Sequence, residues 1–293
     1  MTIAAGGTRL LVVGASGLVG GALAEQASRA GYRVLGAARR PQGWATRALD
    51  LTRPDQIESV LKEFEAQAVF VCSAYAHVDG CERDISRSAL ENVQSVANLI
   101  EALRGSKTLV GFYSTDQVFD GSRDYFVESD QVHPLNVYAR HKREAEVLLL
   151  ERGQTLVVRS AWIFGRELLQ KNFVYQTIRA AQRGESLKVP IAQSGNPTWS
   201  EWLASSTLEL LQQGLSGVVH LTGGETLTKS DWAHQVIRDL SLPPIEVLEV
   251  PPAEAGQVAP RPSRVVLKSE RHSLIQPPLR SILELLKTRF AQL

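Results

Sequence analysis

The chain is short of sulfur and carries almost no net charge. Its 293 residues include two cysteines, Cys72 and Cys81, and one methionine, and the formal net charge is +1. Neither the number nor the spacing of the cysteines suggests a disulfide framework or a zinc site, so we predict no metal centre. Because there is no basic stripe and no block of like charges, nucleic acid and anionic membranes are poor candidates for partners.

Long apolar runs are lacking as well. None reaches the ~18 residues that a membrane span needs. The small and apolar stretch 10–24 is broken by glycines and does not match a signal peptide. We therefore expect a cytoplasmic protein with no membrane partner. The apolar content of 44% and the charged content of 22% are those of an ordinary globular chain. The length suits one large α/β domain, or a cofactor domain with a smaller second lobe.

What the sequence does contain is an alternation of short apolar runs with helical patterns. Strands are predicted at 9–14, 32–38, 68–72, 108–114 and 155–159, and helices at 18–31, 54–64, 86–103 and 138–151. This alternation predicts a parallel sheet, and the unbroken apolar character of the strands predicts helices on both of its faces. Beyond residue 160 the pattern loosens. Helices are predicted there at 173–183, 201–213, 229–240 and 279–290, with a strand at 218–221 and an irregular segment at 243–262.

A glycine-rich loop follows the first predicted strand and opens the first helix. It reads Gly14-Ala-Ser-Gly17-Leu-Val-Gly20. Glycines let a pyrophosphate approach the backbone closely, and the helix N-terminus offers it free N–H groups. The strand, turn and helix context favours a dinucleotide-binding loop over a turn needed only for packing. We predict cofactor contacts from Gly14, Ser16, Gly17, Leu18, Val19 and Gly20.

The second predicted strand has no acidic residue at its end. An NAD enzyme usually has Asp or Glu there to hold the ribose 2′-OH, whereas this chain has Arg39 and Arg40. Two guanidiniums can bind a 2′-phosphate, so the sequence favours NADP(H), although a pair of solvated arginines would look the same. Asp50 and Leu51 could contact the adenine. Ser73 and Ala74, directly after the strand 68–72, are also predicted to line the cofactor site.

Tyr138 and Lys142 are spaced four residues apart at the start of a predicted helix and so share one face. A nearby ammonium stabilises tyrosinate, which would lower the pKa of the phenol toward the working range of an acid–base catalyst. Ser114 and Thr115 close the preceding strand, at the edge where ligands bind to parallel sheets. A hydroxyl there could hydrogen-bond the same carbonyl oxygen as the tyrosine.

Together these segments resemble the dTDP-4-dehydrorhamnose reductase group of extended short-chain dehydrogenases. The matching segments run through nearly the whole chain and lie at 14–20, 76–82, 114–121, 134–138, 159–165, 193–198 and 261–263. The most specific are Ser114-Thr-Asp-Gln-Val-Phe and Pro134-Leu-Asn-Val-Tyr138. The resemblance implies a Rossmann-type doubly wound parallel sheet that binds NADP(H) at 1–160. It also implies a smaller, mainly substrate-binding lobe at 161–293, from which some segments return to the first domain.

The resemblance also implies a reaction and a role for each matched residue. Hydride would pass from NADPH to the C4 keto carbon of a dTDP-4-keto-6-deoxy sugar, with Tyr138 as proton donor. Lys142 would hold the nicotinamide ribose and tune Tyr138, and Thr115 would contact the substrate carbonyl. The residues expected against the sugar are Val78, Asp116, Gln117 and Trp162. Cationic candidates for the nucleotide diphosphate are Arg159, Lys171, Lys188 and Arg261.

Three positions depart from the family pattern. Gln117 stands where Tyr is common, Arg140-His141 stands where Gly with Lys or Arg and then Thr or Ser are usual, and Ala192 stands where an acid is frequent. The first and third leave the identity of the sugar open. Two other functions also stay open: a non-catalytic NADP-binding regulatory subunit, resembling that of methionine adenosyltransferase, and a nucleotide-sugar epimerase of the same fold. The chain could form a homodimer.

Overall fold

A seven-stranded, wholly parallel sheet forms the centre of the molecule. The computed structural model describes residues 6–290. The strand order is β11-β6-β5-β4-β1-β2-β3. The chain therefore runs outward from β1 to β3 on one side of the sheet and from β4 to β11 on the other. The strands are β1 (Arg9–Val13), β2 (Arg33–Ala38), β3 (Arg47–Ala48), β4 (Ala68–Val71), β5 (Leu109–Thr115), β6 (Thr155–Ser160) and β11 (Gly217–His220). Every residue of β4, β5 and β6 is buried, as expected of strands covered on both faces.

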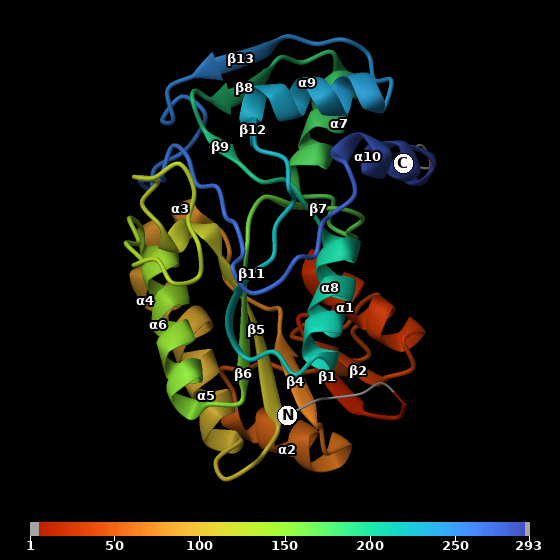
Figure 1. The fold of residues 1–293 in the computed structure, drawn as a ribbon, viewed down its shortest axis with the longest axis vertical. Coiled ribbons are helices and arrows are strands. Elements are labelled where there is room, and N and C mark those ends of the chain that lie inside the picture. The colour runs from red at the N-terminus through yellow and green to blue at the C-terminus, as the bar shows by residue number, and fades with distance from the viewer. Residues whose placement is uncertain (1–5, 291–293) are drawn as a thin grey trace.

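Helices cover both faces of this sheet, and the pleat of each strand divides its side chains between them. Leu10 and Val12 pack on one face with α1 (Leu18–Arg29) and α8 (Ser200–Gln212). Leu11 and Val13 pack on the other face with α2 (Pro54–Phe64), α5 (Ser95–Ala102) and α6 (Val137–Arg152). Figure 1 shows these two helical layers on either side of the strands. The predicted doubly wound arrangement is confirmed.

The helix predicted at 86–103 is interrupted. The chain instead forms α3 (Val78–Arg83), α4 (Ile85–Ala89), a π-helical stretch η1 (Leu90–Gln94) and then α5. Within the π-helical stretch, the buried side chain of Asn92 bonds the backbone N–H of Tyr75 at 2.9 Å and its carbonyl oxygen at 3.2 Å. This long-range bond ties the widened turn to the loop after β4, which helical periodicity alone does not reveal.

Beyond β6 the chain builds three short two-stranded pairings and a third apolar cluster. The pairs join β7 (Ile163–Phe164) with β10 (Thr198–Trp199), β9 (Ser194–Gly195) with β12 (Leu227–Thr228), and β8 (Leu187–Pro190) with β13 (Val247–Val250). The helices are α7 (Phe173–Arg183), α9 (Lys229–Asp239) and α10 (Leu279–Phe290). Most of these elements gather at one end of the molecule (Figure 1). The segment 243–262 was expected to be irregular, and β13 corrects that expectation.

Two elements from beyond residue 160 return to the large sheet. β11 pairs with β6 and α8 packs against α1. The division into a domain at 1–160 and a lobe at 161–293 stays a prediction. Among residues 6–290, no helix is long and apolar enough to span a membrane.

Candidate active site

The glycine loop between β1 and α1 is folded so tightly that side chains at two of its glycines would collide with nearby backbone. Gly14 has a φ of +90°, and a Cβ there would lie 2.6 Å from the amide nitrogen of Ser73. A Cβ on Gly20 would lie 2.2 Å from the carbonyl oxygen of Gly14. Gly17 is the N-cap of α1 and supplies no side-chain cap, so the first N–H groups of the helix are left for an anionic ligand.

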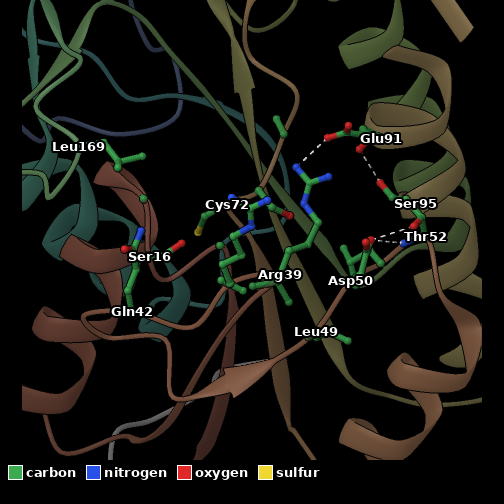
Figure 2. A pocket seen from close by; sticks show the side chains of 18 of the residues that line it. Ser16, Arg39, Gln42, Leu49, Asp50, Thr52, Cys72, Glu91, Ser95 and Leu169 are labelled. Atoms are coloured by element: carbon green, nitrogen blue, oxygen red, sulfur yellow. Dashed lines mark hydrogen bonds and ion pairs between the residues drawn. The ribbon is translucent and has the colours of Figure 1, made fainter. Parts of the chain in front are cut away.

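A cavity of about 700 Å³ opens next to this loop, at the carboxyl ends of the strands. Nine of the predicted cofactor residues line it, namely Gly14, Ser16, Gly17, Arg39, Arg40, Asp50, Leu51, Ser73 and Ala74. Sequence reasoning missed other wall residues, which include Gln42, Leu49, Thr52, Cys72, Arg87, Glu91, Ser95 and Leu169. Figure 2 shows several of these side chains. Leu18, Val19, Gly20, Tyr138 and Lys142 are not on this wall.

The arginines after β2 meet an acid that comes from a distant part of the chain. The guanidinium of Arg39 pairs with the Glu91 carboxylate at 2.9 Å (Figure 2). Arg87 pairs with the same carboxylate at 2.8 Å. The side chain of Glu91 is only 11% exposed, whereas those of both arginines are about half exposed. Within residues 6–290, Asp50 does not pair with an arginine in this way. Its carboxylate accepts hydrogen bonds from the N–H and the hydroxyl of Thr52.

Thr115 and Tyr138 come together where β5 ends and α6 begins. Asn136 caps α6 by accepting a hydrogen bond from the N–H of Ala139 at 2.9 Å, which places Tyr138 in the first turn. The phenol is buried and within hydrogen-bond reach of the Thr115 hydroxyl. Val78, a predicted sugar contact, packs in the same small apolar cluster as Tyr138.

The pKa of Tyr138 does not shift in the expected direction. Burial raises it above its ordinary value, the Asp116 carboxyl and the Cys81 thiol add to the rise, and the bond with Thr115 opposes it. The factors that shift this pKa are the burial of the phenol, Asp116, Cys81 and Thr115, so the tuning of Tyr138 by Lys142 stays a prediction. The Lys142 ammonium instead donates to the carbonyl oxygen of Tyr113 at 2.7 Å.

Lys142 itself is almost completely buried. Burial lowers its pKa to about 7, although the carboxylate of Glu146, one helical turn later, acts to raise it. Its ammonium lies 3.7 Å from the centre of the Phe112 ring. The charge of Lys142 at neutral pH therefore depends on its few buried neighbours.

The remaining predicted sugar contacts are spread around the end of β5. Asp116 is buried, and burial raises its pKa to about 6 against the hydrogen bond from Thr115 and the attraction of Lys229. The side-chain oxygen of Gln117 accepts from the Asn136 amide at 3.0 Å. Trp162 has a φ of +44° and stacks on Trp232 with 5.5 Å between ring centres.

Two of the candidate cations for the nucleotide diphosphate already pair with carboxylates of the protein. Arg159 is buried and makes two bonds to the Glu146 carboxylate, at 3.0 and 2.7 Å, so it cannot reach a ligand. Arg261 pairs with Asp79 at 2.7 Å. Lys171 lies on the wall of the 700 Å³ cavity, and Lys188 is exposed on β8. The prediction that Arg159 contacts the diphosphate was wrong, because the sequence of β6 does not indicate that Arg159 pairs with Glu146.

The strand order and the glycine loop define a Rossmann-type protein with a cavity of dinucleotide size. Within that class the family is set by sequence: the model of the RmlD substrate binding domain matches residues 8–290, and the chain belongs to this family.

Individual relatives agree with this assignment. The chain is 35% identical over 228 residues to a probable dTDP-4,6-dihydroxy-2-methyloxan-3-one 4-ketoreductase of Streptomyces antibioticus, with 76% of each chain covered. It is 32% identical to the dTDP-4-dehydrorhamnose reductase of Aggregatibacter actinomycetemcomitans over 77% of this chain and 76% of the other. A crystal structure of a dTDP-4-dehydrorhamnose reductase from Clostridium acetobutylicum superposes with a TM-score of 0.87 at 24% identity, covering 98% and 100% of the two chains.

Proposed function

We propose that this protein is an NADPH-dependent ketoreductase that reduces the 4-keto group of a dTDP-linked 4-keto-6-deoxy sugar. The observation that carries the proposal is the position of the buried Tyr138, in the first turn of α6 and near Thr115 at the carboxyl end of β5, at the same sheet edge as the glycine loop. The relatives named above are reductases of dTDP-linked keto sugars, which supports this substrate class.

The cavity residues fit NADP(H). A side chain at Gly14 or Gly20 would collide with neighbouring backbone, so the tight turn that brings the loop to the N-terminus of α1 requires glycine at both positions. Arg39 and Arg40 lie on the wall where a 2′-phosphate would be bound. Asp50 and Leu51 line the same wall for the adenine, and Ser73 and Ala74 follow β4 toward the sugar end. When bound, the nicotinamide supplies the hydride.

Within this proposal Tyr138 donates the proton to the developing alkoxide. A phenol whose pKa is raised stays protonated at neutral pH, so the proton is present on the residue that must give it. Thr115 holds the carbonyl oxygen beside it, and Lys142 binds the nicotinamide ribose and supplies positive charge near the phenolate formed. Val78, Asp116, Gln117 and Trp162 surround the sugar.

The first test is loss of NADPH with a panel of dTDP-4-keto-6-deoxyhexoses. We expect wild-type protein to consume NADPH and Tyr138→Phe to be slower by about 10²–10⁴-fold, because the general acid is removed while the ring stays. Tyr125→Phe serves as the matched control, since Tyr125 is exposed and its ring lies against the ammonium of Lys268. Its rate should equal that of the wild type.

Other outcomes would point elsewhere. If NADPH binds, as seen by its fluorescence, but no sugar is reduced, the ketoreductase proposal fails and the regulatory alternative gains weight. If the purified protein retains a tightly held dinucleotide and interconverts sugars without net NADPH loss, the epimerase alternative is favoured.

A further inference from the structure

Arg87 is a cationic side chain on the wall of the 700 Å³ cavity that the proposed function does not use. It lies in α4, whereas Arg39 and Arg40 reach the same cavity from the end of β2. The proposed function assigns the 2′-phosphate of NADP(H) to the second group alone. Cations therefore reach this cavity from two separate parts of the fold, and only one of them has a role.

Contacts on two sides hold the guanidinium of Arg87. Its Nε donates to Oε1 of Glu91 at 2.8 Å, and its Cζ lies 4.2 Å from the centre of the Tyr75 ring. A guanidinium over an aromatic ring is attracted by the ring face. The backbone of Tyr75 is itself bonded to the side chain of Asn92, in the π-helical stretch that also contains Glu91. Although Arg87 is half exposed, its direction is therefore set by the fold.

Glu91 joins this arginine to Arg39. One carboxylate oxygen accepts from Arg87, and the other lies 2.9 Å from Nη2 of Arg39 (Figure 2). Two guanidiniums that share one place repel each other unless an anion lies between them. The almost buried carboxylate is that anion, so it keeps both arginines at the same part of the cavity wall.

These contacts leave hydrogen-bond donors for a ligand. Arg87 uses only Nε, and within residues 6–290 neither of its terminal nitrogens has a hydrogen-bond partner. Arg39 uses only Nη2. The two guanidiniums and the single carboxylate leave an excess of positive charge on the wall. A phosphate monoester carries a charge of about −1.5 to −2 at pH 7 and offers three acceptor oxygens, so it complements both the charge and the donors.

We propose that Arg87 is a second ligand of the 2′-phosphate of NADP(H), and that Glu91 is the positioning residue that holds Arg87 and Arg39 for this phosphate. Arg87 would bind through its terminal nitrogens while its Nε stays on Glu91. The inference rests on the proposed use of NADP(H), and it requires nothing of the sugar. It makes the two walls of the cavity, α4 with the π-helical stretch and the end of β2, one specificity-determining unit.

The test of Arg87 compares NADP⁺ with NAD⁺, which differ only in the 2′-phosphate, by isothermal titration calorimetry without any sugar. Arg87→Met should raise the Kd for NADP⁺ by about 10-fold or more, because a charged hydrogen-bond donor is lost, and should leave the Kd for NAD⁺ unchanged. Arg280→Met is the matched control, since Arg280 also pairs with a glutamate four residues later but lies in α10 and not on the cavity wall. It should change neither Kd.

A lysine at the same position tests the fork of donors. Arg87→Lys keeps the positive charge, but one ammonium cannot replace the planar guanidinium between Glu91 and a phosphate. Most of the loss in NADP⁺ affinity should therefore remain. Full recovery with lysine would show that Arg87 supplies charge alone, and it would overturn the proposed arrangement.

The role of Glu91 has a test of opposite sign. If the carboxylate acted only through its charge, Glu91→Gln would tighten NADP⁺ binding, because a repulsive anion is removed. A positioning role predicts the reverse: the Kd for NADP⁺ should rise by roughly 3-fold or more while that for NAD⁺ stays the same, since a neutral amide holds the guanidiniums less firmly. Tighter or unchanged NADP⁺ binding would refute the positioning role.

The outcomes separate this inference from the ketoreductase proposal. If the wild type prefers NADP⁺ and Arg87→Met changes neither Kd, the inference fails and the ketoreductase proposal stands. If the wild type binds both nucleotides equally, the inference fails together with the choice of NADP(H). If Arg87→Met weakens NADP⁺ alone but no sugar is reduced, the inference stands and the ketoreductase function fails.

Discussion

At the scale of the residue, β2 has no acidic residue at its end, but a carboxylate from another part of the chain lies beside its arginine. Glu91 reaches Arg39 at 2.9 Å from a π-helical stretch far along the chain. The pair leaves the other N–H groups of the Arg39 guanidinium available, since one nitrogen makes the contact. Arg39 can therefore hold a 2′-phosphate while its orientation is fixed by Glu91.

Replacing Arg39 should weaken NADPH binding more than NADH binding. A hydrogen bond to a charged group contributes about 1.5–3 kcal/mol, so Arg39→Ala should raise the Kd for NADPH by roughly 10-fold or more. The Kd for NADH should change little, because it has no 2′-phosphate. Fluorescence titration with both nucleotides measures this. Arg33→Ala, at the far end of β2, is the control, and an equal loss for both nucleotides would contradict the assignment.

Residues in contiguous motifs could be predicted from the sequence, and residues that meet through the fold could not. The glycine loop is local, because its turn and helix start lie within seven residues, and Gly14, Ser16 and Gly17 do line the cavity. Glu91 has no such local signal. Its role is set by a partner more than fifty residues away, namely Arg39.

At the scale of the element, α6 presents three buried polar side chains on one face at intervals of four residues. Tyr138, Lys142 and Glu146 follow one another, and Glu146 is completely buried. Its carboxylate pairs with Arg159 of β6, so the helix is fixed to the strand beside β5. Although burial alone would raise the pKa of Glu146, its bonds with Arg159 hold that pKa below its usual value.

Breaking this pair should destabilise the protein strongly. Glu146→Gln leaves the buried Arg159 uncompensated, which costs about 3–5 kcal/mol, and urea denaturation should show a lower midpoint. Because the folded pKa of Glu146 is depressed, the stabilisation is present above the unfolded value near 4.5 and is lost as the pH falls below it. Glu151→Gln, exposed at the end of α6, should leave the midpoint in place. Equal midpoints for the two variants would rule out this role.

The bounds of helices with a clear apolar periodicity were predicted well. Strands that depend on pairing with a distant part of the chain were not. The helix predicted at 54–64 coincides with α2, whose apolar residues repeat at helical spacing. β13 was missed because prolines surround it and because its register is set by β8, about sixty residues earlier. Local patterns carry no information about such a partner.

At the scale of the whole molecule, Asp79 joins the start of α3 to the segment 258–261. One carboxylate oxygen accepts from the N–H groups of Val258 and Ala259, at 2.7 and 2.9 Å, and both oxygens bond the Arg261 guanidinium. Burial favours a higher pKa for Asp79, but these four bonds hold it well below the usual range. The joint is therefore intact at neutral pH.

Asp79→Asn should loosen this joint without unfolding the sheet. The amides of Val258 and Ala259 would lose a charged acceptor, so hydrogen exchange in a peptide covering 256–262 should become faster. Peptides from β5 should be unaffected. Asp55→Asn, at an exposed position of α2, is the control. Unchanged exchange at 256–262 in the Asp79 variant would show that the segment is held by other contacts.

The late return of β11 to the sheet has a consequence for synthesis. On the ribosome, β6 emerges with an open edge, and the Leu23 side of α1 stays uncovered until Leu203 of α8 can pack against it. At about 5–20 residues per second, this state of the nascent chain lasts for seconds. An unpaired apolar edge of that lifetime invites chaperone capture, so the efficiency of production should depend on how fast the ribosome translates the codons between β6 and β11.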